Sequence, residues 1–122
     1  MYKKYPIGFC KTEIGDGCAI IYKYFLTQSQ KNICRGSGYE KVTAYGIEAT
    51  CEKELGDSIT NVSMDAIECI SPNKERVLGI IEFLRAHEVS PIHLIDIAGS
   101  FIDDCAQDFD EEADVFMKAA ML

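Results

Sequence analysis

Alternating apolar and polar positions predict β-strands in the first half of the chain. The segment 18–26 is rich in β-branched and aromatic residues on both faces, which indicates a strand covered on both sides at one end. The segment 39–52 has one apolar face, formed by Tyr45, Ile47, Ala49 and Cys51. A short turn at 54–57 favours an antiparallel hairpin into a third strand over about 58–70, so that the strands form a meander.

Interruptions of this alternation predict bulges and irregular segments. Gly46 lies inside an apolar run and indicates a bulge or a close approach of two backbones. The apolar parity of the third strand changes near Asp65, and a bulge there would account for the change. Proline and glycines punctuate residues 1–16, which predicts an irregular arm with one short strand at 7–11, and residues 27–38 are predicted to form a polar loop.

Two helices are predicted after residue 70, each beginning at a Ser-Pro pair. In Ser71-Pro72 and in Ser90-Pro91, the hydroxyl can accept from a first-turn amide, and the fixed φ of proline suits the first helical position. Apolar residues then recur at helical spacing: Val77, Ile80, Ile81 and Leu84 in the first helix, and Leu94, Ala98, Phe101 and Cys105 in the second. Only residues 87–89 separate the helices, which predicts a tight corner.

Together these elements predict a single α+β domain of two layers. We expect an antiparallel sheet of three or four strands, covered on one face by two helices, and a short C-terminal helical segment. The chain divides into an irregular arm (1–16), strands (17–70), a helix pair (71–105) and an acidic, partly helical tail (106–122), which either closes the domain or packs on a second copy. Such a sheet keeps open edges and part of one open face, so we expect a homodimer in which a second subunit covers them.

The charge distribution narrows the class of partner. The net charge is −8, with a balance of +4 over residues 1–45, −5 over 46–95 and −7 over 96–122. Because an acidic chain repels phosphate backbones, we expect no nucleic-acid partner. No apolar run is long enough to span a membrane, since Lys23 and Glu82 break the longest ones. The basic start of the chain is not followed by the apolar segment of a signal peptide, so we expect no membrane association and a cytoplasmic protein.

Six cysteines are many for 122 residues. Their even number would fit a disulfide framework in a secreted protein, but nothing in the sequence indicates secretion. No two of them have the spacing of a zinc site or of a redox motif. We therefore expect reduced and mostly buried thiols, and we interpret Cys51 and Cys69, which lie in apolar strand patterns, as small hydrophobic residues.

Candidate chemistry is sparse in this sequence. The acidic residues of 108–114 have the rhythm of a calcium loop, but alanines occupy the positions where that loop requires glycine and glutamate. His93 and Asp96 are three residues apart on the second helix, and with Tyr45 they are the candidates for ligand contacts in a pocket between sheet and helices. We expect no metal site and no cofactor, and the sequence assigns no catalytic residue.

Three segments carry a resemblance to a known family. They are Tyr45-Gly-Ile-Glu48, then Ile70-Ser71 before a helix, and then Val89-Ser-Pro-Ile-His-Leu-Ile-Asp96 followed by Phe101-Ile-Asp-Asp104. Over about residues 39–105 the chain resembles a small family of uncharacterised proteins from anaerobic Gram-positive bacteria, known as a domain of unknown function. The resemblance implies membership of this class of proteins and no mechanism. The first sixteen residues and the tail are expected to lie outside the matching region. An anaerobic host would tolerate six free cysteines more easily.

Two functions from different classes follow from these observations. The first is a non-enzymatic, cytoplasmic interaction or regulatory protein that forms a homodimer and binds a protein partner. The alternative is a small-molecule-binding domain or a minor enzyme with a pocket between sheet and helices. A third reading, an acidic mimic of nucleic acid that captures a basic protein, depends only on the charge of the tail.

Overall fold

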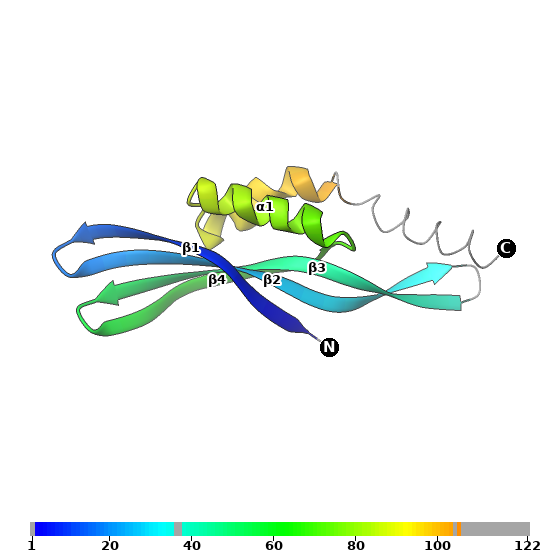
Figure 1. Cartoon of the computed structure of the whole chain (residues 1–122), viewed down its shortest axis with the longest axis horizontal. Helices are drawn as coiled ribbons and strands as arrows, with labels where there is room; N and C mark the ends of the chain where they lie inside the picture. Colours follow the sequence, from blue (N-terminus) through cyan, green and yellow to red (C-terminus); the bar gives the residue numbers. More distant parts are fainter. Residues whose placement is uncertain (1, 36–37, 104, 106–122) are drawn as a thin grey trace.

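The computed structural model of the protein describes residues 2–35, 38–103 and 105. Four antiparallel strands follow one another in space as in sequence: β1 (Lys3–Gly15), β2 (Cys18–Arg35), β3 (Gly38–Leu55) and β4 (Ser58–Ser71). The helix α1 (Lys74–Ala86), the 3-10 turn η1 (Pro91–His93) and a helix over 94–103 complete the described chain. Both helices lie on the same face of the sheet (Figure 1), which confirms the predicted α+β fold of an antiparallel sheet with a helix pair on one side.

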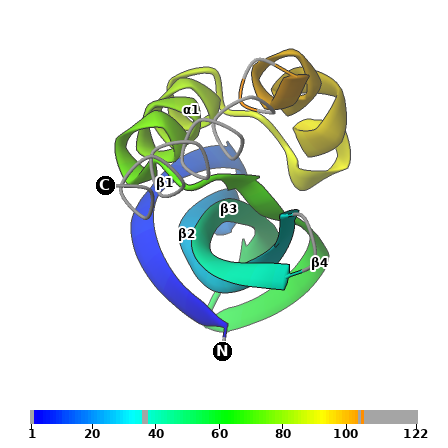
Figure 2. The same ribbon diagram turned by 90° about the vertical axis from the view of Figure 1, so that its right-hand side faces the viewer.

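The sheet is long, twisted and unevenly covered. β2 and β3 pair along their full length, from Cys18 opposite Leu55 to Arg35 opposite Gly38. β1 and β4 flank only part of this hairpin, so its far end continues as a two-stranded ribbon beyond the helices (Figure 1). Viewed along the long axis, the strands trace a curved outline beneath the helices (Figure 2). The helices therefore cover the middle of one face.

Two segments predicted as irregular are strands. The irregular arm expected over residues 1–16 is wrong, because β1 pairs with β2 from Lys3 to Gly15. Its alternation is concealed by a register shift between Pro6 and Gly8, and proline is tolerated there because β1 is an edge strand. The polar loop expected from residue 27 is also wrong, because β2 continues to Arg35 and is held there by pairing with β3 alone.

The pairing of β3 with β4 explains Gly46. A Cβ atom at this position would lie 2.1 Å from the carbonyl oxygen of Ile67 and 2.4 Å from that of Glu68, so the predicted close approach of two backbones is confirmed. Here Tyr45 faces Ser71 and Ile47 faces Ile67, and β4 therefore accommodates extra residues. The bulge predicted near Asp65 is wrong in position: pairing is regular through Asp65, and the register shifts lie on either side of it.

One hydrophobic core joins the sheet to the helices. Its buried members are Tyr24, Leu26, Ile47, Ala49, Ile70, Val77, Ile80, Ile81, Leu84, Leu94, Ala98 and Cys105. The helical spacing of Val77 to Leu84 and the strand alternation of Ile47 and Ala49 therefore predict the core correctly. The N-terminal cap of α1 differs from the prediction, because Asn73 accepts from the amide of Arg76 while Ser71 still belongs to β4 and accepts from the amide of Asn73.

The corner between the helices has the tight form that its length predicts. Glu88 has a positive φ of 51°, and the amide of Val89 donates to the carbonyl of Leu84 at 3.0 Å. Ser90 caps the next turn as predicted, accepting from the amide of Ile92. The predicted tail helix at 106–122 lies outside the described residues. Within the described part of the chain, no helix combines the length and the apolar character needed to cross a membrane.

Candidate functional site

The three residues predicted as ligand contacts lie on two layers of the structure. His93 ends η1, and Asp96 lies one turn later on the following helix; both side chains are exposed. Tyr45 lies in β3 opposite Gln28 and is half-buried against the core. The structure thus brings His93 and Asp96 together on one helical surface and places Tyr45 in the sheet. Ligand binding by these residues stays a prediction.

The space between sheet and helices is filled by fully buried side chains such as Tyr24, Leu26 and Leu94. Two pockets formed by described residues lie elsewhere. One, of about 180 Å³ between α1 and the second helix, is lined by Arg76, Gly79, Ile80, Phe101 and Cys105. The other, of about 210 Å³ at the turns, is lined by residues that include Lys11, Glu13, Asp16, Cys18 and Glu54. Both are smaller than the roughly 300 Å³ at which pockets begin to enclose drug-sized ligands.

Side chains that could bind a metal or act as nucleophiles are dispersed. Among the residues that the structure describes, no group of three or more His, Cys, Asp or Glu side chains is placed to hold a metal ion. No disulfide joins any of the five described cysteines: Cys51 and Cys105 are buried, Cys10 and Cys18 are half-buried, and Cys69 is exposed. The thiols were expected to be mostly buried, but only Cys51 and Cys105 of the described five are, and Cys69 on the outer strand β4 is exposed.

Cys10 and Tyr24 form a contact that ties the sheet to the helix corner. The Tyr24 hydroxyl donates to the carbonyl of Val89 at 2.7 Å, and the Cys10 thiol lies 3.8 Å from that hydroxyl and 3.4 Å from the carbonyl oxygen of Arg85. Burial raises the pKa of the Cys10 thiol, and it also raises the pKa of the Tyr24 hydroxyl. Because a nucleophilic cysteine requires a thiolate, this pair is suited to structural hydrogen bonding and poorly suited to catalysis.

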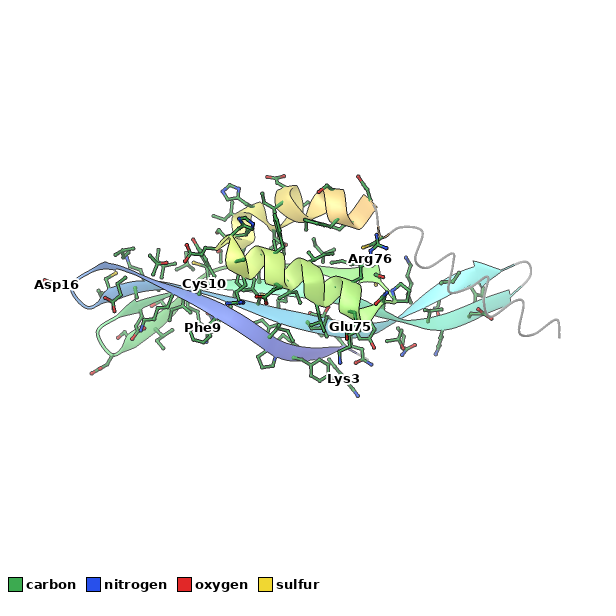
Figure 3. All side chains as sticks on the ribbon, turned by 45° about the horizontal axis from the view of Figure 1, so that its top comes forward. Lys3, Phe9, Cys10, Asp16, Glu75 and Arg76 are labelled. Atoms are coloured by element: carbon green, nitrogen blue, oxygen red, sulfur yellow. The ribbon has the colours of Figure 1, made fainter. Side chains whose placement is uncertain are left out.

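The open face of the sheet, the side away from the helices, has a different character. Antiparallel partners share a face, and successive residues alternate between faces, so the register assigns this side. Its main side chains are Lys4, Phe9, Lys11, Lys23, Phe25, Thr27, Glu48, Thr50, Glu52, Glu54, Ile59 and Met64. Figure 3 shows the neighbours Phe9 and Cys10 on opposite sides of β1, with Phe9 on the side away from the helices.

A buried carboxylate lies at the centre of the open face. The side chain of Glu48 is only 8% exposed, and one of its oxygens is 2.8 Å from the ammonium nitrogen of Lys4. The Tyr2 hydroxyl donates to the other oxygen at 3.5 Å, and the Lys4 ammonium lies 4.7 Å from the ring centre of Phe25. Together these contacts compensate the loss of hydration of Glu48 and hold the start of β1 against β3.

Two more ion pairs extend this arrangement along the open face. Lys23 and Glu52 approach to 3.0 Å, and so do Lys11 and Glu54. In each pair a lysine of β1 or β2 contacts a glutamate of β3. We name the six charged residues of these three pairs the floor of the open face; they are Lys4, Lys11, Lys23, Glu48, Glu52 and Glu54. The floor is therefore balanced in charge. Because the lysines are partly exposed, each pair adds only a small net stability, on the order of 0–1 kcal/mol.

Large apolar side chains rise on both sides of this floor. Phe9 on β1 is 63% exposed, while Ile59 and Met64 on β4 are 62% and 64% exposed. Phe9 and Met64 lie at the same level of the sheet, because Phe9 faces Lys23, Lys23 faces Thr50 and Thr50 faces Met64. Sequence reasoning missed this surface. The available signal was the apolar residue at every second or third position of 59–64.

A meander of four antiparallel strands with a helix pair on one face and a mixed charged and apolar surface on the other defines a small α+β protein. The chain belongs to a family of unknown function (DUF6514), whose pattern matches residues 3–104. The match reaches further towards the N-terminus than the resemblance over 39–105, so the expectation that the first sixteen residues lie outside it is wrong. No curated protein and no solved structure matches the chain.

Proposed function

We propose that this chain is a non-enzymatic interaction protein that contacts a protein partner through the open face of its sheet. One observation carries the proposal: Phe9, Ile59 and Met64 expose large apolar side chains on both sides of a charge-balanced floor. An apolar surface of this kind, with polar groups between its members, is typical of protein contact sites. The floor would contribute specificity, and the apolar side chains would contribute most of the binding free energy.

The reduced cysteines support a cytoplasmic location for this activity. No disulfide joins the described cysteines, and Cys69 is exposed. A reducing compartment keeps such thiols from forming disulfides, whereas a secreted protein would expose Cys69 to oxidation. The proposed interaction therefore takes place in the cytoplasm.

A small-molecule site between sheet and helices has less support, because fully buried side chains occupy that layer. Native mass spectrometry of freshly purified, reduced protein separates the two functions. The proposed interaction protein gives peaks at 13.6 kDa or a multiple of it. A stoichiometric additional mass that disappears on unfolding would favour the ligand-binding alternative.

The open face is tested by a pair of matched surface variants. Phe9→Asp places a charge on the open face, and Ile92→Asp places the same charge on η1, where Ile92 is 73% exposed. Tagged wild-type and variant chains are used to capture partners from extracts of the source cells, with bound proteins quantified by mass spectrometry. We expect Phe9→Asp to lose at least about 90% of the captured partner, a free-energy loss of about 1.4 kcal/mol, and Ile92→Asp to retain it. Equal capture by both variants would contradict the proposal, provided that their melting temperatures match the wild type.

A further inference from the structure

The two edges of the sheet differ in how they are protected. β1 and β4 are the outer strands, and each therefore has a row of backbone amide and carbonyl groups with no neighbouring strand. Native proteins usually protect such edges with lysines, prolines, bulges or a covering segment. A protected edge disfavours pairing with another chain, and an unprotected edge favours it.

β1 carries several of these protective features. Pro6 removes a backbone donor, and the register shifts between Pro6 and Gly8. Lys3, Lys4 and Lys11 place positive charges along the same strand. Two copies that paired through β1 would bring these lysines close together, so this edge is unsuited to self-association.

The first half of β4 has almost none of this protection. Residues 58–64, Ser-Ile-Thr-Asn-Val-Ser-Met, include neither a charged residue nor a proline, although the whole chain has a net charge of −8. Six of the seven side chains are exposed, and Ile59, Val62 and Met64 are each at least 59% exposed. One register shift occurs here, at Val62, and it affects the pairing with β3. We name residues 58–64 the neutral edge.

We propose that the neutral edge pairs antiparallel with the neutral edge of a second copy of this chain, about a two-fold axis, to form one continuous eight-stranded sheet. This proposal goes beyond the proposed contact through the open face, because it concerns the outer edge of β4 and names a second copy of this chain as its partner. The charge distribution fits a second copy: two acidic chains repel one another over most of their surface, and the neutral edge is a strip on which they approach without opposing like charges. Thr60, Asn61 and Ser63 are short polar side chains, which form compatible cross-strand pairs with residues of the second copy.

The same pairing would supply cover for exposed apolar groups. Ile59 and Met64 lie on the open face of β4, so antiparallel pairing about an axis between Asn61 and Val62 places Ile59 of each copy beside Met64 of the other. With the axis perpendicular to the sheet, both open faces lie on one side of the assembly and both helix pairs on the other. Phe9, at the opposite edge, remains available for another protein.

The test is made on purified, reduced protein without any partner. The mass is measured by light scattering and native mass spectrometry between about 1 and about 100 µM, since dimer formation follows mass action. The wild type is expected to reach twice 13.6 kDa within this range. The double variant Ile59→Lys, Val62→Lys is expected to raise the dimer dissociation constant at least about tenfold, because it brings lysines together at the neutral edge. Phe9→Lys, the matched change on β1, is expected to leave the constant unchanged.

Amide hydrogen exchange of the wild type provides a second readout that does not depend on a variant. Amides of residues 58–64 that point away from β3 should exchange at least about tenfold more slowly at high than at low protein concentration. A monomer at every concentration would overturn the proposal, and so would a dimer that Phe9→Lys dissociates while the β4 variant does not. A dimer without protection at 58–64 would also overturn it. Loss of partner capture by Phe9→Asp with an intact dimer would leave the proposed function standing separately.

Discussion

Gly46→Ala tests the backbone geometry on which the sheet is built. The added Cβ would lie 2.1 Å from the carbonyl oxygen of Ile67 and 2.4 Å from that of Glu68, whereas such contacts are essentially never shorter than 3.0 Å. Both neighbouring atoms belong to the backbone of β4, so rotation of a side chain cannot relieve the overlap. β4 has to move away from β3 at the point where its chain turns towards α1.

The expected cost follows from this overlap. Inserting one methyl group into a closely packed site usually costs about 1–3 kcal/mol, and displacement of a paired strand places Gly46→Ala at about 3 kcal/mol or above. Gly79→Ala is the matched control, because Gly79 lies in α1 and its added Cβ would meet no atom within 4 Å. In a helix interior, alanine is favoured over glycine by about 0.8–1.0 kcal/mol. The same chemical change should therefore shift stability in opposite directions at the two positions.

Urea unfolding followed by circular dichroism measures both effects. We expect Gly46→Ala to lower the free energy of unfolding by about 3 kcal/mol, and Gly79→Ala to raise it by about 1 kcal/mol. Both substitutions reduce the freedom of the unfolded chain equally, so their difference reports the native state. A Gly46→Ala variant within about 0.5 kcal/mol of the wild type would show that β3 and β4 do not approach as described.

Three further outcomes are expected. Lys4→Met leaves the buried carboxylate of Glu48 without its cation. Because Lys4 is itself partly exposed, urea unfolding should show that the free energy of unfolding falls by about 1–2 kcal/mol. An unchanged free energy of unfolding would contradict the role of this ion pair. Tyr24→Phe removes the hydrogen bond to the carbonyl of Val89 and should lower the free energy of unfolding by about 1–2 kcal/mol at neutral pH. Burial raises the pKa of Tyr24 in the folded state, so the wild type should lose stability as the pH rises above 10.0, the ordinary tyrosine value, and Tyr24→Phe should lose less; thermal melts across that pH range check this. Cys69 is exposed and should be alkylated before the other described cysteines, as peptide mapping after brief iodoacetamide treatment would show.

Most parts of the fold that the sequence predicts have an apolar face packed against the other layer. In β3, Ile47 and Ala49 alternate with polar residues because only one side meets the helices. In α1, Val77 and Leu84 recur at helical spacing for the same reason. Periodicity reports burial, and so it identifies an element where burial is one-sided.

The elements that were missed are held by pairing without such burial. β1 is exposed along most of its length, and Pro6 with the following register shift breaks its alternation. The segment after Thr27 remains a strand because β3 pairs with it over the same length. Its polar residues gave a loop signal because backbone hydrogen bonds to β3 require no apolar pattern in the side chains.

Local sequence patterns could not predict the surface of the open face, because its contacts join residues that are far apart in the chain. Lys4 and Glu48 are 44 residues apart, and their contact exists only after β1 and β3 take their places on either side of β2. Phe9 and Met64 reach the same level of the sheet through three successive strand pairings. A sequence indicates which residues are charged or apolar, whereas the register decides which of them share a surface.

The strand order of the meander also has a consequence for how the chain folds. Each strand pairs only with its neighbours in sequence, so the sheet can form by successive hairpins with short loop closures. The contact between Tyr24 and Val89 spans 65 residues, and it forms only when the helix pair docks. Until then Leu26 and Ile47 remain exposed to water on one side of the sheet. Premature termination before α1 would therefore release a chain with a bare apolar layer, and such a chain would be prone to aggregation.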